Sequence, residues 1–139
     1  MTPLRQRFEQ DHARQGAPDE ESDFLNHLRV MAMSCRIKPR ADLFKACALL
    51  QLDGSATREA YSEALVRCLD TALGQRTQLF SPGVIERSFD ERWLIALARA
   101  SGREDEPSLS FLLSSRVPAQ NRRMIRFLIG RIAGCFELR

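Results

Sequence analysis

Apolar residues recur at helical spacing along most of the chain, and no stretch shows the alternation of a half-buried strand. Residues 22–36 show the helical pattern well, because their apolar positions repeat at intervals of three and four residues. Gly, Pro or a capping residue separates each such stretch from the next. The pattern predicts main helices at 22–36, 40–52, 57–73, 89–101 and 118–138, and short helices at 3–15 and 107–115.

The predicted fold class is therefore all-α. The chain has 139 residues, which suits one domain, and folding at this length buries about two thirds of the unfolded chain's surface. We expect a single compact, bundle-like domain over residues 1–139, built from five main helices plus short N-terminal and linking helices. Residues 1–20 form a possible N-terminal arm, since they carry few large apolar side chains.

The stretch from Ser88 to Ser101 is predicted to be the central helix. Ser88 and Glu91 have the spacing of a capping box, and Gly102 stands where a helix end favours a left-handed residue. The helix between these signals is apolar almost all round, which is typical of a buried helix, and Trp93 is its predicted anchor. Residues 40–52 are similarly apolar and are expected beside it. The predicted inner positions are Phe89, Trp93, Ala96, Leu97 and Ala100, and the predicted polar strip is Glu91, Arg92 and Arg99.

The helix at 22–36 has a second, smaller apolar stripe formed by Val30, Met33 and Ile37. One stripe is enough to join the core, and exposed apolar stripes seldom stay bare. We expect these three residues at a subunit contact or under the N-terminal arm.

The connection from Gln75 to Arg87 is the longest one between predicted helices. It contains Leu79, Phe80, Val84 and Ile85, which is too apolar for a free loop. We expect it to be pinned to the body of the protein, with a single turn after Pro82.

Arginines cluster at the start of the last predicted helix, where they suggest an anion site. Arg116, Arg122, Arg123 and Arg126 lie there, and no acidic residue occurs between Ser108 and Phe136. The alternative is an ordinary solvated face, because the net charge is only +3 and no exposed aromatics are interleaved as in single-strand binders. If an acidic segment such as residues 104–106 folds back onto the cluster, the nucleic-acid hypothesis loses its support.

Two further features of the last helix concern packing. Arg131 falls inside its apolar arc, so we expect it to pair with an acid of the central helix, Asp90 or Glu91. Gly130 and Gly134 have a spacing that favours close approach of another helix.

The sequence contains no recognisable catalytic, metal or cofactor motif. The four cysteines, Cys35, Cys47, Cys68 and Cys135, show no C-x-x-C spacing, and each falls on the apolar side of a predicted helix. His27 is interpreted as a boundary histidine satisfied by hydrogen bonding, with a phosphoryl-accepting histidine as the other possibility. We predict no cofactor and no metal.

These observations favour a non-catalytic, cytoplasmic interaction or regulatory protein, with a protein partner or self-association as a homodimer. No apolar run is long enough for a membrane span, and the first residues lack the apolar region of a signal peptide. The second hypothesis is nucleic-acid or other polyanion binding through the arginine cluster. The third is an enzyme or phosphotransfer domain that uses His27.

Overall fold

The computed structural model of the chain describes residues 19–37 and 57–139. Five α-helices pack together in these two segments, and neither segment contains a strand. The all-α prediction is confirmed, whereas the predicted helices at 3–15 and 40–52 lie outside the described residues. No described helix is long and apolar enough to cross a bilayer. The helices are α2 (Glu20–Ile37), α4 (Arg58–Leu73), α5 (Phe89–Gly102), α6 (Glu106–Arg116) and α7 (Ala119–Cys135).

Local capping explains where the helices begin and end. The side chain of Thr57 accepts a hydrogen bond from the backbone of Ala60 at the start of α4, and Gly74 ends this helix with a φ of 67°. Ser88 and Glu91 form the predicted capping box of α5. Asp105 caps α6, with a proline in the first turn.

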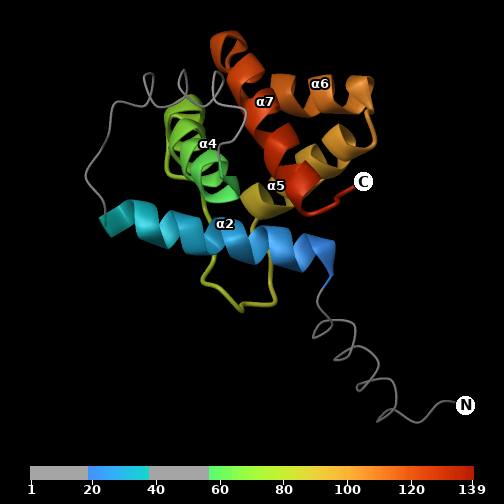
Figure 1. Cartoon of the computed structure of the whole chain (residues 1–139). Coiled ribbons are helices and arrows are strands. Elements are labelled where there is room, and N and C mark those ends of the chain that lie inside the picture. Colours follow the sequence, from blue (N-terminus) through green and yellow to red (C-terminus); the bar gives the residue numbers. More distant parts are fainter. Residues whose placement is uncertain (1–18, 38–56) are drawn as a thin grey trace, which may run out of the picture.

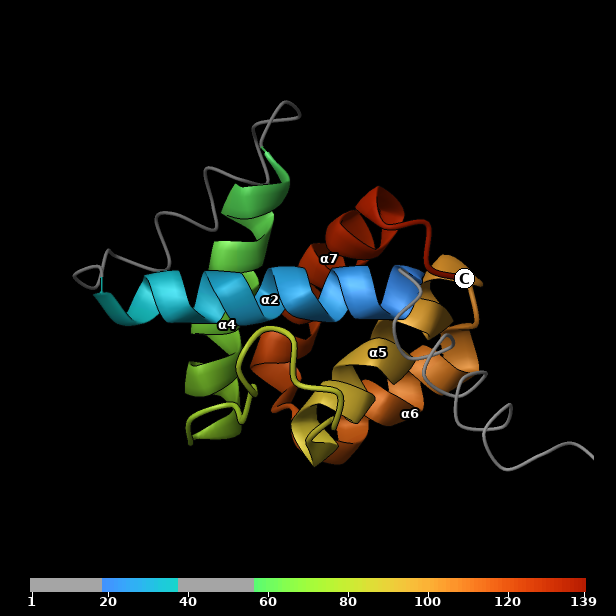
Figure 2. The ribbon, with the colours of Figure 1, turned by 90° about the horizontal axis from the view of Figure 1, so that it is seen from below.

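Helix α2 crosses α4 at a steep angle along one side of the domain, and α6 lies on the side away from it (Figures 1 and 2). Helix α7 packs against both α4 and α5, while α6 packs against α5 on the side away from α4. α2 contacts α4 and α5, and the loop at residues 74–88 lies against α2. All five helices therefore contribute to one continuous apolar core.

The core confirms the central position of α5. Trp93 is buried, and its indole N–H donates to the carbonyl of Leu112 on α6 at 3.1 Å. Leu94, Leu97 and Ala98 of the same helix are completely buried. Burial of this kind stabilises a fold by about 1.5–3 kcal/mol for each large aliphatic side chain.

The predicted division of α5 into inner and outer residues was wrong at two positions. Phe89 is 64% exposed, whereas Glu91, assigned to the polar strip, is completely buried. Phe89 is the first residue of the helix, where its side chain projects past the end of the core. Glu91 can enter the core because a buried arginine from α2 meets it.

Gly102 at the end of α5 and Gly130 in α7 lie where another segment packs closely. Gly102 is part of α5 and does not have the predicted left-handed conformation. A side chain there would collide with the backbone carbonyl of Leu138, since a Cβ atom would lie only 1.6 Å from its oxygen. Gly130 faces the hydroxyl of Ser101 on α5, where a Cβ atom would lie 3.3 Å away, while Gly134 has open space. The predicted close approach is therefore found at Gly130 alone of the pair.

The cysteines only partly follow the prediction that they lie on apolar faces. Cys68 is buried and Cys35 is half-buried, but Cys135, in the last turn of α7, is exposed. The fourth cysteine, Cys47, falls outside the described residues.

Candidate interaction surface

A fully buried ion pair joins α2 to α5. The guanidinium of Arg29 contacts the carboxylate of Glu91 through two hydrogen bonds, Nε to Oε2 at 2.6 Å and Nη2 to Oε1 at 3.1 Å. Arg29 is 2% exposed and Glu91 is 0% exposed. Paired hydrogen bonds of this kind fix the orientation of both side chains.

Arg29 uses its remaining N–H groups to hold the 74–88 loop. Nη1 donates to the carbonyl oxygens of Val84 at 2.7 Å and Ser81 at 3.3 Å, and Nη2 donates to that of Glu86 at 2.9 Å. A guanidinium has five N–H donors, and all five are used here. The loop is therefore fastened by a side chain from a helix far away in the sequence.

Glu91 completes the arrangement from the other side. Its carboxylate accepts hydrogen bonds from the backbone N–H groups of Ser88 at 2.8 Å and Phe80 at 3.1 Å. Burial by itself would raise the pKa of Glu91, but the hydrogen bonds from Arg29, Ser88 and Phe80 outweigh burial and hold the pKa below its ordinary value. The carboxylate is consequently charged at neutral pH, although it is buried.

Three more contacts fix the backbone of the loop. The N–H of Gly83 donates to Asn26 of α2 at 3.2 Å. The N–H groups of Thr77 and Gln78 donate to the carboxylates of Asp70 at 2.8 Å and Asp90 at 2.7 Å. The predicted pinning of this loop to the body is confirmed, but polar contacts to its backbone provide much of it.

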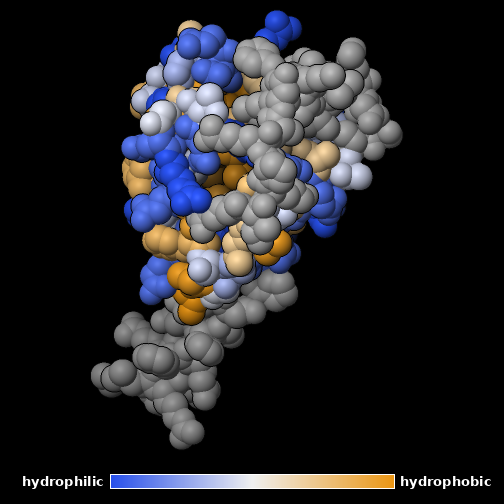
Figure 3. Space-filling view, turned by 90° about the vertical axis from the view of Figure 1, so that its left-hand side faces the viewer, coloured by the Kyte–Doolittle hydropathy of each residue, from blue (hydrophilic) through white to orange (hydrophobic). Residues whose placement is uncertain are grey.

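Two aliphatic side chains of the pinned loop remain at the surface. Ile85 is 58% exposed and Val84 is 36% exposed. Val30 and Met33 on the outer side of α2 are 52% and 50% exposed. Hydrophobic side chains gather at the lower edge of the face seen in Figure 3, where the C-terminal end of α2 and the loop lie. We call Val30, Met33, Val84 and Ile85 the α2–loop surface.

This surface extends the stripe that the sequence pattern predicts. Val30 and Met33 do face outward, whereas the side chain of Ile37 lies outside those described. Their predicted place at a subunit contact or under the N-terminal arm stays a prediction. Val84 and Ile85 join them only through the fold, because the loop is distant from α2 in sequence.

The arginine cluster is largely occupied by contacts within the protein. Arg116 pairs with Asp90 at 2.7 Å, and Arg126 pairs with Glu106 of α6. Arg122 donates through Nε to the carbonyl of Val117 at 2.8 Å. Within the described segments, Arg123 is the one member whose side chain makes no ion pair or hydrogen bond. The acidic segment at residues 104–106 thus contributes one partner to the cluster.

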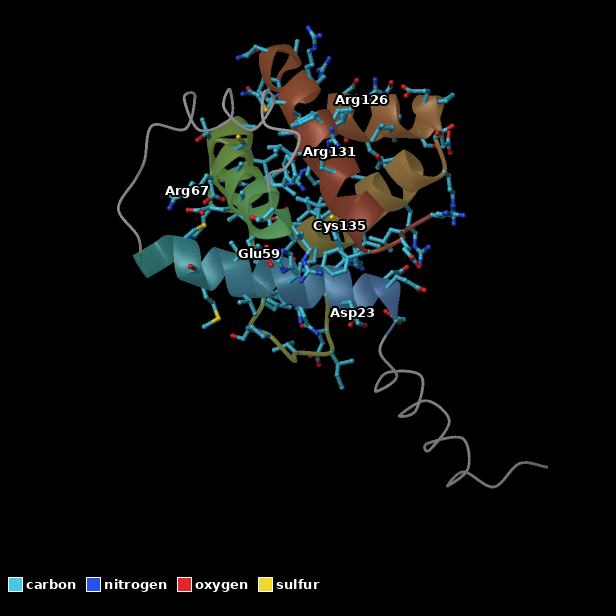
Figure 4. The ribbon with its side chains drawn as sticks, viewed as in Figure 1. Asp23, Glu59, Arg67, Arg126, Arg131 and Cys135 are labelled. Atoms are coloured by element: carbon cyan, nitrogen blue, oxygen red, sulfur yellow. The ribbon has the colours of Figure 1, made fainter. Side chains whose placement is uncertain are left out.

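Arg131 does not make the predicted ion pair with the central helix. Asp90 and Glu91 are held by Arg116 and Arg29 instead. Arg131 is exposed, and its guanidinium lies over the ring of Phe127 at 5.6 Å and that of Tyr61 at 6.0 Å (Figure 4). The apolar arc of α7 ends in aromatic rings at this position, and a guanidinium can stack on such rings while it stays in water.

His27 is the boundary histidine that the sequence analysis favoured. Its Nε2 lies 2.7 Å from the hydroxyl of Ser62, and that hydroxyl donates to the carbonyl of Arg58 at 2.8 Å. His27 therefore donates to Ser62, because the single hydroxyl proton is already used. Burial, and secondly the charge of Arg58, lower the pKa of His27. The ring also packs against Phe136, which favours a structural role.

The described residues contain no group of three or more His, Cys, Asp or Glu side chains that is arranged to hold a metal ion.

Arg29 is the important residue that sequence reasoning missed. A signal for it exists, since Arg29 lies four residues after Leu25 and three before Ala32, within the apolar stripe of α2. A charge in such a stripe indicates a buried partner. Glu91 was named from the sequence as a candidate partner of a buried arginine, but it was assigned to Arg131 instead of Arg29.

No family model, curated protein or solved structure gives a significant match to this chain.

Proposed function

We propose that this chain is a non-catalytic protein-interaction module that binds its partner through the α2–loop surface. The four residues of the surface are aliphatic or thioether side chains that stand exposed on a helix and on the loop fastened to it. Clustered apolar groups on the outside of a protein are typical of interaction sites. Protein partners bury such groups in the central part of an interface.

The observation that carries the proposal is the way in which the loop is held. Burying an ion pair costs several kcal/mol per ion in desolvation, and hydrogen bonds must offset this cost. Here the buried Arg29–Glu91 pair directs three of its hydrogen bonds to carbonyls of an exposed loop. Holding Val84 and Ile85 in place before a partner arrives lowers the entropy lost on binding.

A second copy of the chain is the first partner to test. Val30 and Met33 lie on one side of a single helix, and such a face can meet its own copy across a twofold axis. Polyanion binding has weaker support, because Arg116, Arg122 and Arg126 are engaged within the protein.

The proposal is tested by capture with the full-length protein as bait. We expect the wild type to capture a set of host proteins or an untagged copy of itself. Met33→Glu and Ile85→Glu should both fail to capture the same proteins. Thr71→Glu, at an exposed position of α4, is the matched control. It adds the same charge at a distant position and should still capture the same proteins. Identical captured sets for the wild type and both surface variants would contradict the proposal.

A further inference from the structure

A groove of about 560 Å³ runs between α5 and α6 on the outside of the protein. Ala96 and Ala100 line it on the α5 side, and their small side chains leave the space open. Phe111 and Leu112 line it on the α6 side. The bond from Trp93 to the carbonyl of Leu112 joins the two helices beneath. The volume falls in the range of about 300–1,000 Å³ that is common for ligand sites.

Phe111 is the most exposed large apolar side chain in the described segments, at 71%. It stands on a helix whose residues from Pro107 to Ser115 carry no charge and include four serines. The α6 wall of the groove therefore offers an aromatic side chain and hydroxyl groups. An aromatic residue so placed is a typical anchor of a protein interface.

The α5 wall is basic. Arg99 and Arg103 line the groove, and Arg92 is exposed one helical turn before Ala96. Arg99 is paired with Glu21 of α2. Within the described structure, the guanidinium groups of Arg92 and Arg103 have neither an ion pair nor a hydrogen bond.

The acids near the groove are mostly committed elsewhere. Asp105 caps α6 through the N–H of Ser108, and Glu106 pairs with Arg126, which leaves Glu104 in the turn. Hydrogen bonds from Ser108, and after them the charge of Arg103, lower the pKa of Asp105. One edge of the groove thus remains basic, while the opposite edge is neutral.

We propose that this groove docks an amphipathic helical segment of a partner protein, with apolar anchors against Phe111 and the two alanines and with Asp or Glu facing Arg92 and Arg103. Helices that bind in grooves present apolar side chains three or four residues apart, and such side chains would meet Phe111 and the two alanines that line this groove. Acidic neighbours on the same segment would complement the basic α5 edge.

This site is separate from the α2–loop surface and stands without it. Its residues belong to α5, α6 and the turn between them, whereas the other surface belongs to α2 and the 74–88 loop. A chain with both surfaces can hold two partners at once.

A selection of phage-displayed random 16-residue peptides on the immobilised full-length protein tests the proposal. We expect enriched peptides with more Asp and Glu than Lys and Arg, and with apolar residues three or four apart. Their Kd, measured by fluorescence anisotropy, should rise at least about thirtyfold for Phe111→Ala, since truncating a central aromatic anchor has effects of this size. Arg103→Gln should raise it by about three- to tenfold, with the difference shrinking as salt rises.

Two control variants keep the result interpretable. Arg123→Gln on α7 should leave the Kd unchanged, and Ala96→Leu should abolish binding by filling the groove while Phe111 stays in place. The proposal is overturned if no enriched peptide depends on Phe111, or if the dependent peptides are basic or neutral. It is also overturned if Phe111→Glu turns a wild-type dimer into a monomer, since the occupant is then a second copy. Peptides that depend on Ile85 but not on Phe111 would remove the groove and leave the α2–loop surface intact.

Discussion

The arginine cluster at the end of α6 and the start of α7 and the α2–loop surface use charged residues in opposite ways. At the cluster, Arg116 and Arg126 form ion pairs with carboxylates on other helices, so their charges are largely neutralised within the protein. Beneath the α2–loop surface, Arg29 and Glu91 are buried. They hold the backbone of a loop whose exposed side chains are apolar. The arginines that are easiest to notice in the sequence therefore belong to the site with the weaker support as a binding surface.

The difference shows that a local pattern of residues predicts a site poorly until its partners are known. Arginines close together in the sequence look like an anion site because no acid lies near them in the chain. In the fold, acids come from α5 and α6, because helices α5 to α7 pack against one another. An apolar surface on a pinned loop is visible only after folding, because it combines segments about 50 residues apart.

The largest effect should come from breaking the buried pair. Arg29→Met leaves the carboxylate of Glu91 buried without its partner, and we expect a loss of about 3–5 kcal/mol in the free energy of unfolding. Urea denaturation measures this loss. Glu91→Gln in the Arg29→Met background should recover part of it, because the amide carries no charge. A loss below about 1 kcal/mol for Arg29→Met would mean that the pair is not the fastening of the loop.

Lowering the pH should reduce the stability of the fold in two steps. The pKa of His27 is lowered in the fold, so the unfolded chain binds the proton more readily and stability falls as the pH drops below about 6.5. Glu91 and Glu21 also have lowered pKa values, although burial opposes the lowering, so stability falls again below about pH 4.5. Thermal unfolding between pH 2.5 and 8 should show both losses. The first step should be absent in His27→Gln, and its persistence there would assign it to another group.

A smaller effect is expected where the arginine cluster meets α5. Arg116→Met removes the ion pair with Asp90 and also the cation–π contacts of the guanidinium with the rings of Phe89 and Trp93. Asp90 still accepts from the N–H of Gln78, so we expect a loss of about 1–2 kcal/mol by urea denaturation. If Arg116→Met lowered the free energy of unfolding as much as Arg29→Met does, the arginine cluster would stabilise the fold as strongly as the buried pair, which would contradict the comparison.

The smallest effect should be at the outer part of the cluster. Glu106 is well exposed and Arg126 is partly exposed, and surface pairs contribute about 0–1 kcal/mol. Arg126→Gln should therefore shift the free energy of unfolding by less than about 0.5 kcal/mol.

Binding of a generic DNA duplex should be weak near 50 mM salt and lost near 200 mM, and fluorescence anisotropy measures the affinity at both salt concentrations. Tight binding that disappears when Arg122, Arg123 and Arg126 all become Gln would restore the nucleic-acid hypothesis.

The helices of this fold follow well from the sequence, because spacing and capping are local. Trp93 marked the central helix, and the Ser88–Glu91 capping box marked its start. The Glu63–Arg67 pair on α4 is likewise a local feature, and it forms at 3.2 Å.

The candidate site could be predicted only in part. Val30 and Met33 are visible in the sequence as a second stripe on one helix. The loop was expected to be pinned because of its apolar residues, yet Val84 and Ile85 are exposed, and Arg29 and Glu91 hold the loop through its backbone. Pairings between distant segments, such as Arg116 with Asp90, depend on helix packing that no local pattern records. The error at Arg131 has the same origin.

The central claim is that the 74–88 loop is fixed before a partner arrives and that the partner binds there. Amide hydrogen exchange, measured on the free protein and on its complex with the captured partner, tests both parts at once. In the free protein, we expect the amides of Phe80 and Gly83 to exchange far more slowly than those of exposed Gln75 and Arg76, because they donate to Glu91 and Asn26. In the complex, further slowing should be confined to α2 and this loop. A loop that exchanges freely until the partner binds, or a partner that protects α7 instead, would contradict the account.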